Sequence, residues 1–236
     1  MMTELTLPII GYMHSSYKEK FGIPRQPNLV QVESYIEMLA PYNDVLAFEG
    51  IEAFSHLWLV WQFHDNKNPE KTQFRPQVRP PRLGGNKKIG VFATRSMYRP
   101  SQIGLSVVRL KCVKKEGKSV RVYVTGSDLL DGTPIVDIKP YIHYSDAVID
   151  AESGYAQDEP KRKSVIWSDR AIEQKQQLLT SGKLSVQTAQ ELEAVLSLDP
   201  RPAYQDDEAR VYKMKFAAVD IAFTVGETTV NITAVE

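Results

Sequence analysis

The sequence predicts a mainly β fold, with an N-terminal β-barrel over residues 1–150 and a smaller C-terminal α+β domain over residues 165–236. Three observations lead to this prediction. Residues 54–63 alternate as a strand does, residues 104–126 contain a hairpin signal, and the predicted helices occur only after residue 165. Many short strands joined by turns with glycine or proline are typical of a barrel or a compact sheet.

The N-terminal strands are predicted from apolar runs and from alternation. In residues 54–63, Leu57, Leu59 and Trp61 share one face and the other face is also largely apolar, which indicates a central strand buried on both sides. The segment KKEGK places Gly117 at the turn of a hairpin. Residues 31–39 fit a strand or a short helix, and we favour the strand. The predicted strands are residues 5–12, 31–39, 54–63, 104–114, 119–126 and 135–142, and residues 91–93 resemble the start of another.

The C-terminal part follows a change in composition. Residues 146–160 hold five acidic residues and no basic ones, and they lack apolar periodicity, which predicts a linker or a long surface loop. Ser168 stands where it can cap a helix that ends near Gly182, and Ser185 can cap a second helix that stops at Asp199 and Pro200. The final segments VDIAFTV and VNITAV predict a hairpin.

Composition and motifs exclude several classes of protein. Cys112 is the only cysteine, so a disulfide framework, a zinc cluster and a CxxC redox pair are excluded. The four histidines have no metal-ligand spacing, so we expect no metal, and the glycine motifs of dinucleotide-binding and P-loop folds are absent. The N-terminus does not resemble a signal peptide and no apolar run reaches membrane-spanning length, so we expect a soluble cytoplasmic protein that does not bind a membrane.

Charge is unevenly distributed along the chain. The net charge is zero, but residues 67–99 contain nine basic residues and only Glu70 opposes them, which gives +8 and leaves −8 for the remainder. Such asymmetry fits a surface for nucleic-acid phosphates, or a solvated loop that lysines keep soluble. On charge alone the solvated loop is the somewhat stronger interpretation.

Four polar segments with glycine or proline interrupt the apolar strands, at residues 18–29, 62–66, 93–106 and 128–141. Loops of this kind at one end of a rigid barrel are where binding sites are built. The third segment contains Arg95 and Arg99 between two stretches of core, which a simple hairpin does not need. Taken alone, Arg95 could instead pair with Asp128 or Asp131 as a structural bridge.

These segments carry a resemblance to a known family. Six motifs that are spread over nearly the whole chain resemble the TsaA-like family and its bacterial TrmO-type members. They are GVFATRSMYRPSQIGLSVVRL, FSHLWLVWQFH, RPPRLGG, DLLDGTPIVDIKPYI, YKEKFGIPRQPNL and DPRPAY. The resemblance implies an N-terminal barrel that binds S-adenosylmethionine, a homodimer, and methylation of N6 of threonylcarbamoyladenosine at tRNA position 37, beside the anticodon.

The resemblance also implies which residues bind the cofactor and the RNA. A carboxylate on the cofactor and a second carboxylate on the threonine of the substrate both call for cations, and anticodon-loop phosphates call for more. The predicted cofactor contacts are Gln26, Pro27, Asn28, Leu29, His64, Asp65, Arg95, Leu105, Leu130, Asp131, Gly132 and Thr133. The predicted contacts to the substrate and the tRNA anticodon stem-loop are Lys18, Lys20, Arg25, Arg82, Lys87, Lys88 and Arg99.

Several alternatives stay open at the level of sequence. The family usually has Arg-Pro-Asn-Pro where this chain has Ser101 and Gln102 after Arg99 and Pro100, and usually a proline where it has Ser16. These departures concern loop rigidity and tRNA preference more than the reaction. The residues name no catalytic base, and Asp131 is better explained as a turn residue. The alternative functions are an S-adenosylmethionine-binding regulatory module without transferase activity, and a transferase with another acceptor. The C-terminal domain fits tRNA contacts as well as a packing or dimer role.

Overall fold

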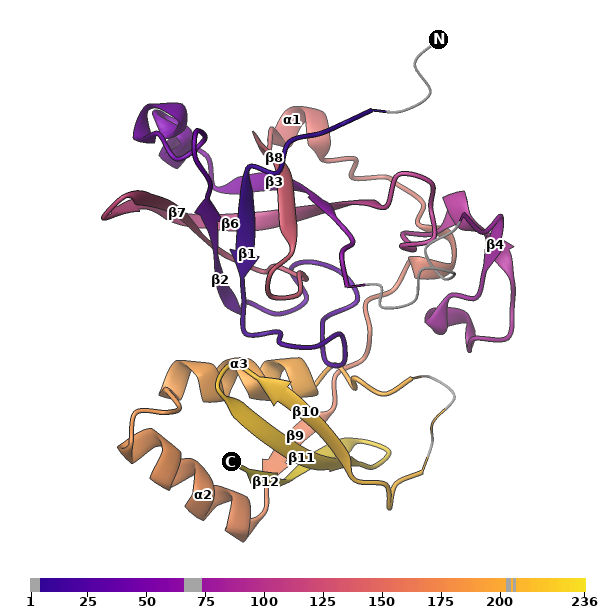
Figure 1. Ribbon diagram of the computed structural model, residues 1–236. Coiled ribbons are helices and arrows are strands. Elements are labelled where there is room, and N and C mark those ends of the chain that lie inside the picture. Colours follow the sequence, from indigo (N-terminus) through magenta and orange to yellow (C-terminus); the bar gives the residue numbers. More distant parts are fainter. Residues whose placement is uncertain (1–4, 66–73, 203–204, 206) are drawn as a thin grey trace.

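The N-terminal part is a closed barrel of six antiparallel strands. The computed structural model describes residues 5–65, 74–202, 205 and 207–236. Figure 1 shows the barrel above a second, smaller sheet. Around the barrel the strands follow the order β1-β2-β7-β6-β3-β8, with bounds β1 Gly11–His14, β2 Glu33–Met38, β3 His56–Gln62, β6 Ile103–Glu116, β7 Ser119–Thr125 and β8 Pro134–Pro140. The predicted mainly β class with a barrel is confirmed.

Alternation along the strands fills the barrel with apolar side chains. Met13, Ile36, Leu57, Leu59 and Ile135 are fully buried inside it. The outward side chains of β3 are half-buried rather than buried, so the prediction of a strand buried on both faces holds for the inner face only. The outer face is covered in part by the short helix α1 (His143–Asp146), where the indole N–H of Trp58 donates to Asp146 Oδ2 at 2.9 Å.

Two sequence predictions about strands need correction. The first strand begins at Gly11 rather than Leu5, because β8 pairs only with Gly11 and Tyr12, and Leu5 stays exposed. The apolar run at residues 91–93 forms no strand. The two-stranded ribbon of β4 (Gln77–Val78) and β5 (Ile89–Gly90) ends there, and Val91–Ala93 coils into a single 3₁₀ turn that buries Val91 and exposes Phe92.

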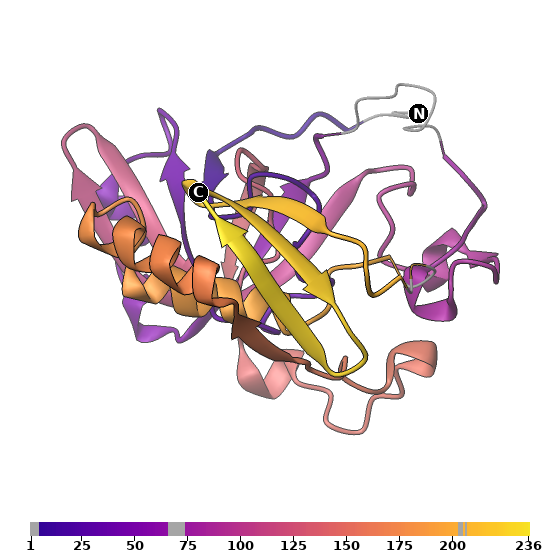
Figure 2. The ribbon, with the colours of Figure 1, turned by 90° about the horizontal axis from the view of Figure 1, so that it is seen from below.

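The C-terminal part is a four-stranded sheet with two helices beside it (Figure 2). The strand order is β10-β11-β12-β9, and β9 runs parallel to β12. The hydroxyl groups of Ser168 and Ser185 accept hydrogen bonds from the first turns of the two helices, as predicted. The bounds are β9 Ser164–Trp167, α2 Asp169–Thr180, α3 Val186–Leu196, β10 Tyr212–Phe216, β11 Val219–Val225 and β12 Thr229–Val235.

The segment between β1 and β2 joins the two parts. Tyr17, Val30 and Val32 belong to the apolar core of the C-terminal part, not to that of the barrel. The N–H of Ala217 donates to Ser16 O at 2.8 Å, and Tyr17 forms an isolated bridge with Phe216. The loop between β1 and β2, which carries the polar segment of residues 18–29, is therefore held by both the barrel and the C-terminal part. None of the helices within the described ranges is long and apolar enough to cross a membrane.

Candidate active site

A cavity of about 490 Å³ lies at one end of the barrel, where all four polar segments meet. Its size suits a small organic molecule, and its walls combine aromatic and aliphatic side chains with a few charged ones. The apolar wall includes Trp61, Phe63 and Ile103. Ten of the residues singled out in the sequence line it: Lys20, Arg25, Gln26, His64, Asp65, Arg95, Arg99, Leu105, Leu130 and Thr133.

The two arginines between the stretches of core both line this cavity. Arg95 Nη1 donates to Gln26 Oε1 at 2.5 Å, and Arg99 Nη2 donates to Thr94 O at 3.0 Å. Each guanidinium is thus held in place by a neutral oxygen. The bridge from Arg95 to Asp128 or Asp131 that the residues alone allowed is replaced by the contact with Gln26.

Asp128 is a charged residue of the cavity wall that the sequence did not single out as a site residue. The hydroxyl of Ser106 donates to Asp128 Oδ1 at 2.6 Å, and the indole N–H of Trp61 donates to that hydroxyl at 3.0 Å. Burial raises the pKa of Asp128 to about 6, although the Ser106 hydrogen bond and the charge of Arg95 act in the opposite direction. A carboxyl group held in this way is an expected partner for a positively charged ligand.

The side chain of Asp131 is occupied away from the cavity. Its Oδ1 accepts the N–H of Ser15 at 2.9 Å, and its Oδ2 lies 2.9 Å from Lys18 Nζ. Neither Asp131, Lys18 nor Gly132 lines the cavity, whereas Leu130 and Thr133 on either side do. Gly132 has a φ of 79°, which glycine adopts without strain. In this segment Asp131 holds the turn, and its neighbours reach the cavity.

The residues after Gln26 hold the loop instead of lining the cavity. Asn28 has a φ of 64°, donates from its side chain to Val107 O at 2.9 Å, and donates from its backbone N–H to Gly126 O at 2.8 Å. Pro27, Asn28 and Leu29 are absent from the cavity wall, although the resemblance implied that they contact a cofactor. The bonds of Asn28 to Val107 and Gly126 hold the loop that carries Gln26.

A histidine and an ion pair close the side of the cavity formed by residues 62–65. The Nζ atom of Lys20 lies 3.7 Å from Asp65 Oδ2 and also donates to the backbone carbonyl of Asp65. Burial lowers the pKa of His64, an effect that Asp65 partly offsets, so the imidazole is neutral near pH 7. Described His, Cys, Asp and Glu side chains form no group of three that could hold a metal ion.

The remaining predicted RNA contacts lie outside this cavity. Lys87 and Lys88 are exposed between the 3₁₀ turn Pro81–Leu83 and β5, and Arg82 donates to the carbonyl of Asp158. Arg75 stands 4.5 Å over the ring of Tyr98. Two lysines of the basic segment, Lys67 and Lys71, lie outside the described residues.

Two family models match nearly the whole chain. A model of the tRNA-methyltransferase O N-terminal domain matches residues 12–147, and a model of the TrmO C-terminal domain matches residues 160–236. A protein of Escherichia coli strain K12 named tRNA (adenine(37)-N6)-methyltransferase is 45% identical over 208 residues, which cover 88% of this chain and 86% of the relative.

Two proteins of Pseudomonas aeruginosa are also similar. One, named putative S-adenosylmethionine-dependent methyltransferase RcsF, is 45% identical over 223 residues, covering 93% of this chain and 92% of the relative. The crystal structure of TrmO from this organism matches with a TM-score of 0.79 at 35% identity and covers 100% of this chain and 99% of that one. The barrel, the smaller α+β part and both family models together show that the chain belongs to the TrmO family of tRNA methyltransferases.

Proposed function

We propose that the protein transfers the methyl group of S-adenosylmethionine to N6 of threonylcarbamoyladenosine at position 37 of tRNA, next to the anticodon. The observation that carries the proposal is the cavity of about 490 Å³ that four separate loops line, two of which contribute Arg95, Arg99 and Asp128. Relatives that match most of the chain are named tRNA (adenine(37)-N6)-methyltransferase and S-adenosylmethionine-dependent methyltransferase, which supports both the reaction and the cofactor.

The side chains of the cavity fit the charges of S-adenosylmethionine. The cofactor has a carboxylate, an ammonium group, a sulfonium and a flat adenine. Arg95 suits the carboxylate, because guanidinium and carboxylate groups form strong charge-assisted hydrogen bonds. Asp128 suits one of the positive groups, and Trp61 and Phe63 supply an apolar wall for the remainder. The backbone groups beside Gln26 and between Leu130 and Thr133 complete the proposed cofactor site.

The residues of the protein act mainly by positioning. Bound S-adenosylmethionine supplies a methyl group that its sulfonium already activates. The acceptor N6 lies between a purine ring and a carbonyl, so its lone pair is delocalised and it becomes a good nucleophile only when its proton leaves. Positive charge from Arg99 next to the acceptor lowers the pKa of that proton and stabilises the anion that forms. Holding the acceptor in line with the methyl group supplies a large part of the rate.

The substrate contacts divide into two groups by location. Lys20 and Arg25 lie at the cavity and suit the carboxylate of the threonine, and Arg99 lies there beside the acceptor, whereas Lys18 is paired with Asp131. Arg82, Lys87 and Lys88 are exposed beside the barrel and suit the phosphates of an anticodon stem-loop. The proposal assigns the cofactor to residues 1–150 and further tRNA or dimer contacts to residues 165–236.

The proposal includes a cytoplasmic homodimer. After β8 the chain exposes several large apolar side chains, among them Tyr144 at 91% and Ile149 at 95%. Exposed apolar groups of this size suit contact with a second copy of the chain. Light scattering of the purified protein at micromolar concentration should give the mass of two chains, and a single-chain mass would remove this part of the proposal.

One incubation tests the reaction. The protein and S-adenosylmethionine are mixed with tRNA that carries threonylcarbamoyladenosine, and a parallel sample uses the same tRNA without the modification. The nucleosides are then analysed by mass spectrometry. We expect a gain of one methyl group on the threonylcarbamoyl nucleoside alone. Binding of the cofactor without methyl transfer would favour the regulatory module, and transfer to a different nucleoside would change the acceptor.

A further inference from the structure

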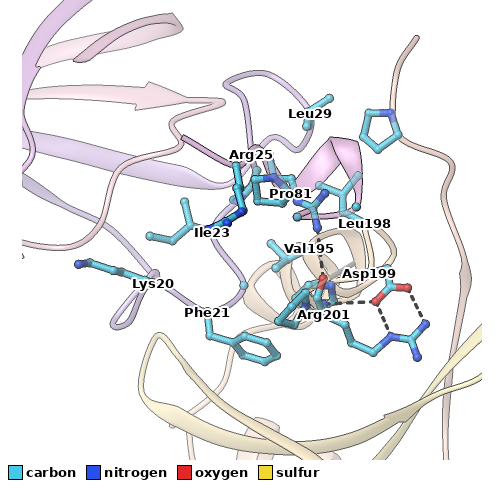
Figure 3. A pocket seen from close by; sticks show the side chains of 18 of the residues that line it. Lys20, Phe21, Ile23, Arg25, Leu29, Pro81, Val195, Leu198, Asp199 and Arg201 are labelled. Carbon is cyan, nitrogen blue, oxygen red and sulfur yellow. Dashed lines mark hydrogen bonds and ion pairs between the residues drawn. The ribbon is translucent and has the colours of Figure 1, made fainter. Parts of the chain in front are cut away.

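A second cavity, of about 510 Å³, lies next to the first (Figure 3). Its walls come from residues 20–29, from the turn and loop at residues 79–86, from Pro160, and from the end of α3 with residues 198–202. Lys20, Ile23, Pro24 and Arg25 line both cavities. One short stretch of chain therefore forms the boundary where the two cavities meet.

The wall of the second cavity is stiff and largely apolar. Proline occurs in every segment that contributes to it, including Pro24, Pro81 and Pro200. Figure 3 shows the apolar side chains Ile23, Val195 and Leu198 grouped around the cavity. Because proline limits the freedom of these loops before a ligand arrives, binding there orders little additional chain.

Positive charge is in excess around the second cavity. Arg201, which is only 7% exposed, donates from Nε and Nη2 to the two carboxylate oxygens of Asp199, at 2.9 Å each. Burial alone would raise the pKa of Asp199, but Arg201 and Lys163 hold it below its usual value, so this pair is ionised and balanced. Arg25 and Arg79 add positive charge to the wall without a second carboxylate from the lining residues.

Arg25 is in addition fixed between the two parts of the molecule. Its Nη2 donates to the backbone carbonyl of Arg201 at 3.2 Å, and the dashed line in Figure 3 marks this bond. The contact places a cation from the N-terminal loop against the C-terminal part, at the boundary of the two cavities. Residues of both the N-terminal part and the C-terminal part are therefore needed to form the wall of the second cavity.

We propose that the second cavity binds the threonylcarbamoyl-modified nucleoside itself. This inference rests on the proposed function. The threonylcarbamoyl arm joins a flat aromatic base, whose faces pack on apolar groups, to a carboxylate a few bonds away, and the cavity joins an apolar wall to Arg25 and Arg79. With the arm in the second cavity, N6 faces the shared boundary at Ile23–Arg25 and the cofactor cavity beyond it. The C-terminal part then serves to recognise the modification.

The test compares two anticodon stem-loop RNAs of one sequence, with and without the threonylcarbamoyl group. Their affinities are measured by fluorescence anisotropy in the presence of S-adenosylhomocysteine, which has no methyl group to transfer. We expect Arg79→Gln and Leu198→Trp, which remove a cation and fill the cavity, to weaken binding of the modified RNA about tenfold, the usual effect of one charged hydrogen bond. Binding of the unmodified RNA should change by less than about twofold on the same scale.

Arg82→Gln is the matched control, because Arg82 is a cation of the same loop that does not line the cavity. It should leave the ratio of the two affinities unchanged. Affinity for S-adenosylmethionine and the melting temperature, measured for each variant, show that the first cavity and the fold are intact. Arg79 is exposed, so its replacement tests the inference even where Leu198→Trp impairs folding.

An equal loss for both RNAs would overturn the inference and assign the cavity to a common phosphate contact. No loss for either RNA in Arg79→Gln would also overturn it. Failure of the proposed function is separate: wild-type protein would then leave the modified tRNA unmethylated in the incubation described above. Methylation by the wild type together with unchanged preference in the variants would reject the second cavity alone.

Discussion

At the scale of single residues, Asp128 carries the clearest pH dependence. Its folded-state pKa, raised to about 6, lies above the ordinary value of 3.8. The folded state therefore holds this proton more tightly than the unfolded state, and the stability that results is complete below pH 3.8 and lost as the pH rises to about 6. At neutral pH the ionised side chain destabilises the fold.

Asp128→Asn should therefore stabilise the protein without cofactor at pH 7, by about 1–3 kcal/mol in the free energy of unfolding. Asparagine keeps an oxygen that can accept the hydrogen bond of Ser106. Urea unfolding at pH 7 and at pH 4 measures the difference between variant and wild type. The gain should shrink strongly at pH 4, and an equal gain at both values would mean that burial of charge is not the cause.

The same carboxylate should make cofactor binding depend on pH. His64, Asp65, Lys20 and Arg95 also face the cavity, but the protonation of Asp128 changes near pH 6. Since a protonated Asp128 cannot neutralise a cation, wild-type affinity for S-adenosylmethionine should be about tenfold lower at pH 5 than at pH 7. Calorimetric titration of Asp128→Asn should give weaker binding and a flat profile over this range. A profile that flattens in His64→Gln instead would assign the effect to the histidine.

The residue level also shows what sequence reasoning could not find. The polar loops were recognised, and ten of their predicted residues line one cavity. Asp128 belongs to one of those loops, but its importance depends on Ser106 and Trp61, which come from two other strands. Conversely, Asn28 and Asp131 have side chains suited to ligands, yet both bind the protein itself. The spacing of residues along the sequence does not show which polar side chains are already hydrogen-bonded to neighbours in the folded protein.

At the scale of elements, the start of β6 packs against β3 with no space to spare. A Cβ atom on Gly104 would lie 2.3 Å from the indole ring of Trp61, which is also part of the cavity wall. Gly104→Ala should therefore destabilise the protein by about 1–3 kcal/mol, as overpacking in a core does. It should also weaken binding of S-adenosylmethionine, because the displaced indole changes the cavity.

Gly90→Ala is the control for this change. Gly90 has a φ of −58° and no heavy atom within 4 Å of the position that a Cβ would occupy. Thermal unfolding and cofactor titration of both variants then compare the addition of one methyl group against Trp61 with its addition in open space. Equal effects in the two variants would contradict the role of close packing against Trp61.

Elements whose ends depend on residues close in sequence were predicted well, whereas strand ends that depend on a distant partner strand were not. Ser168 and Ser185 cap their helices as expected, because a cap depends on residues within one turn. Within residues 31–39, Glu33–Met38 form β2, so the strand that we favoured is confirmed. Residues 5–10 and 91–93 are as apolar as true strands, but the pairing of β8 with β1 begins only at Gly11 and the pairing of β4 with β5 ends at Gly90. Partners distant in sequence decide where such strands begin and stop.

At the scale of the whole molecule, charge is uneven along the sequence, because residues 67–99 carry +8 in a chain of zero net charge. In Figure 1 the region around β4 and the tip of the β6–β7 hairpin lie at opposite ends of the barrel. Both regions expose lysines, at Lys87 and Lys88 near β5 and at Lys115 and Lys118 in the hairpin. Replacing either lysine pair by glutamate changes the net charge by the same amount, but at different ends of the barrel.

Reversing Lys87 and Lys88 to glutamate should weaken tRNA binding and its dependence on salt. Each lost phosphate contact lowers the slope of log affinity against log salt by about 0.7–0.9, so the pair should lower it by about 1.5. The Lys115→Glu/Lys118→Glu variant has the same net charge and should stay close to wild type in filter-binding assays from 50 to 200 mM salt, a range in which such contacts are sensitive. Equal slopes for the two double variants would mean that net charge, rather than a surface beside the cavities, attracts the tRNA. An unchanged affinity in both would place the RNA on another face, and the lysines would then act only to keep an exposed loop in solution.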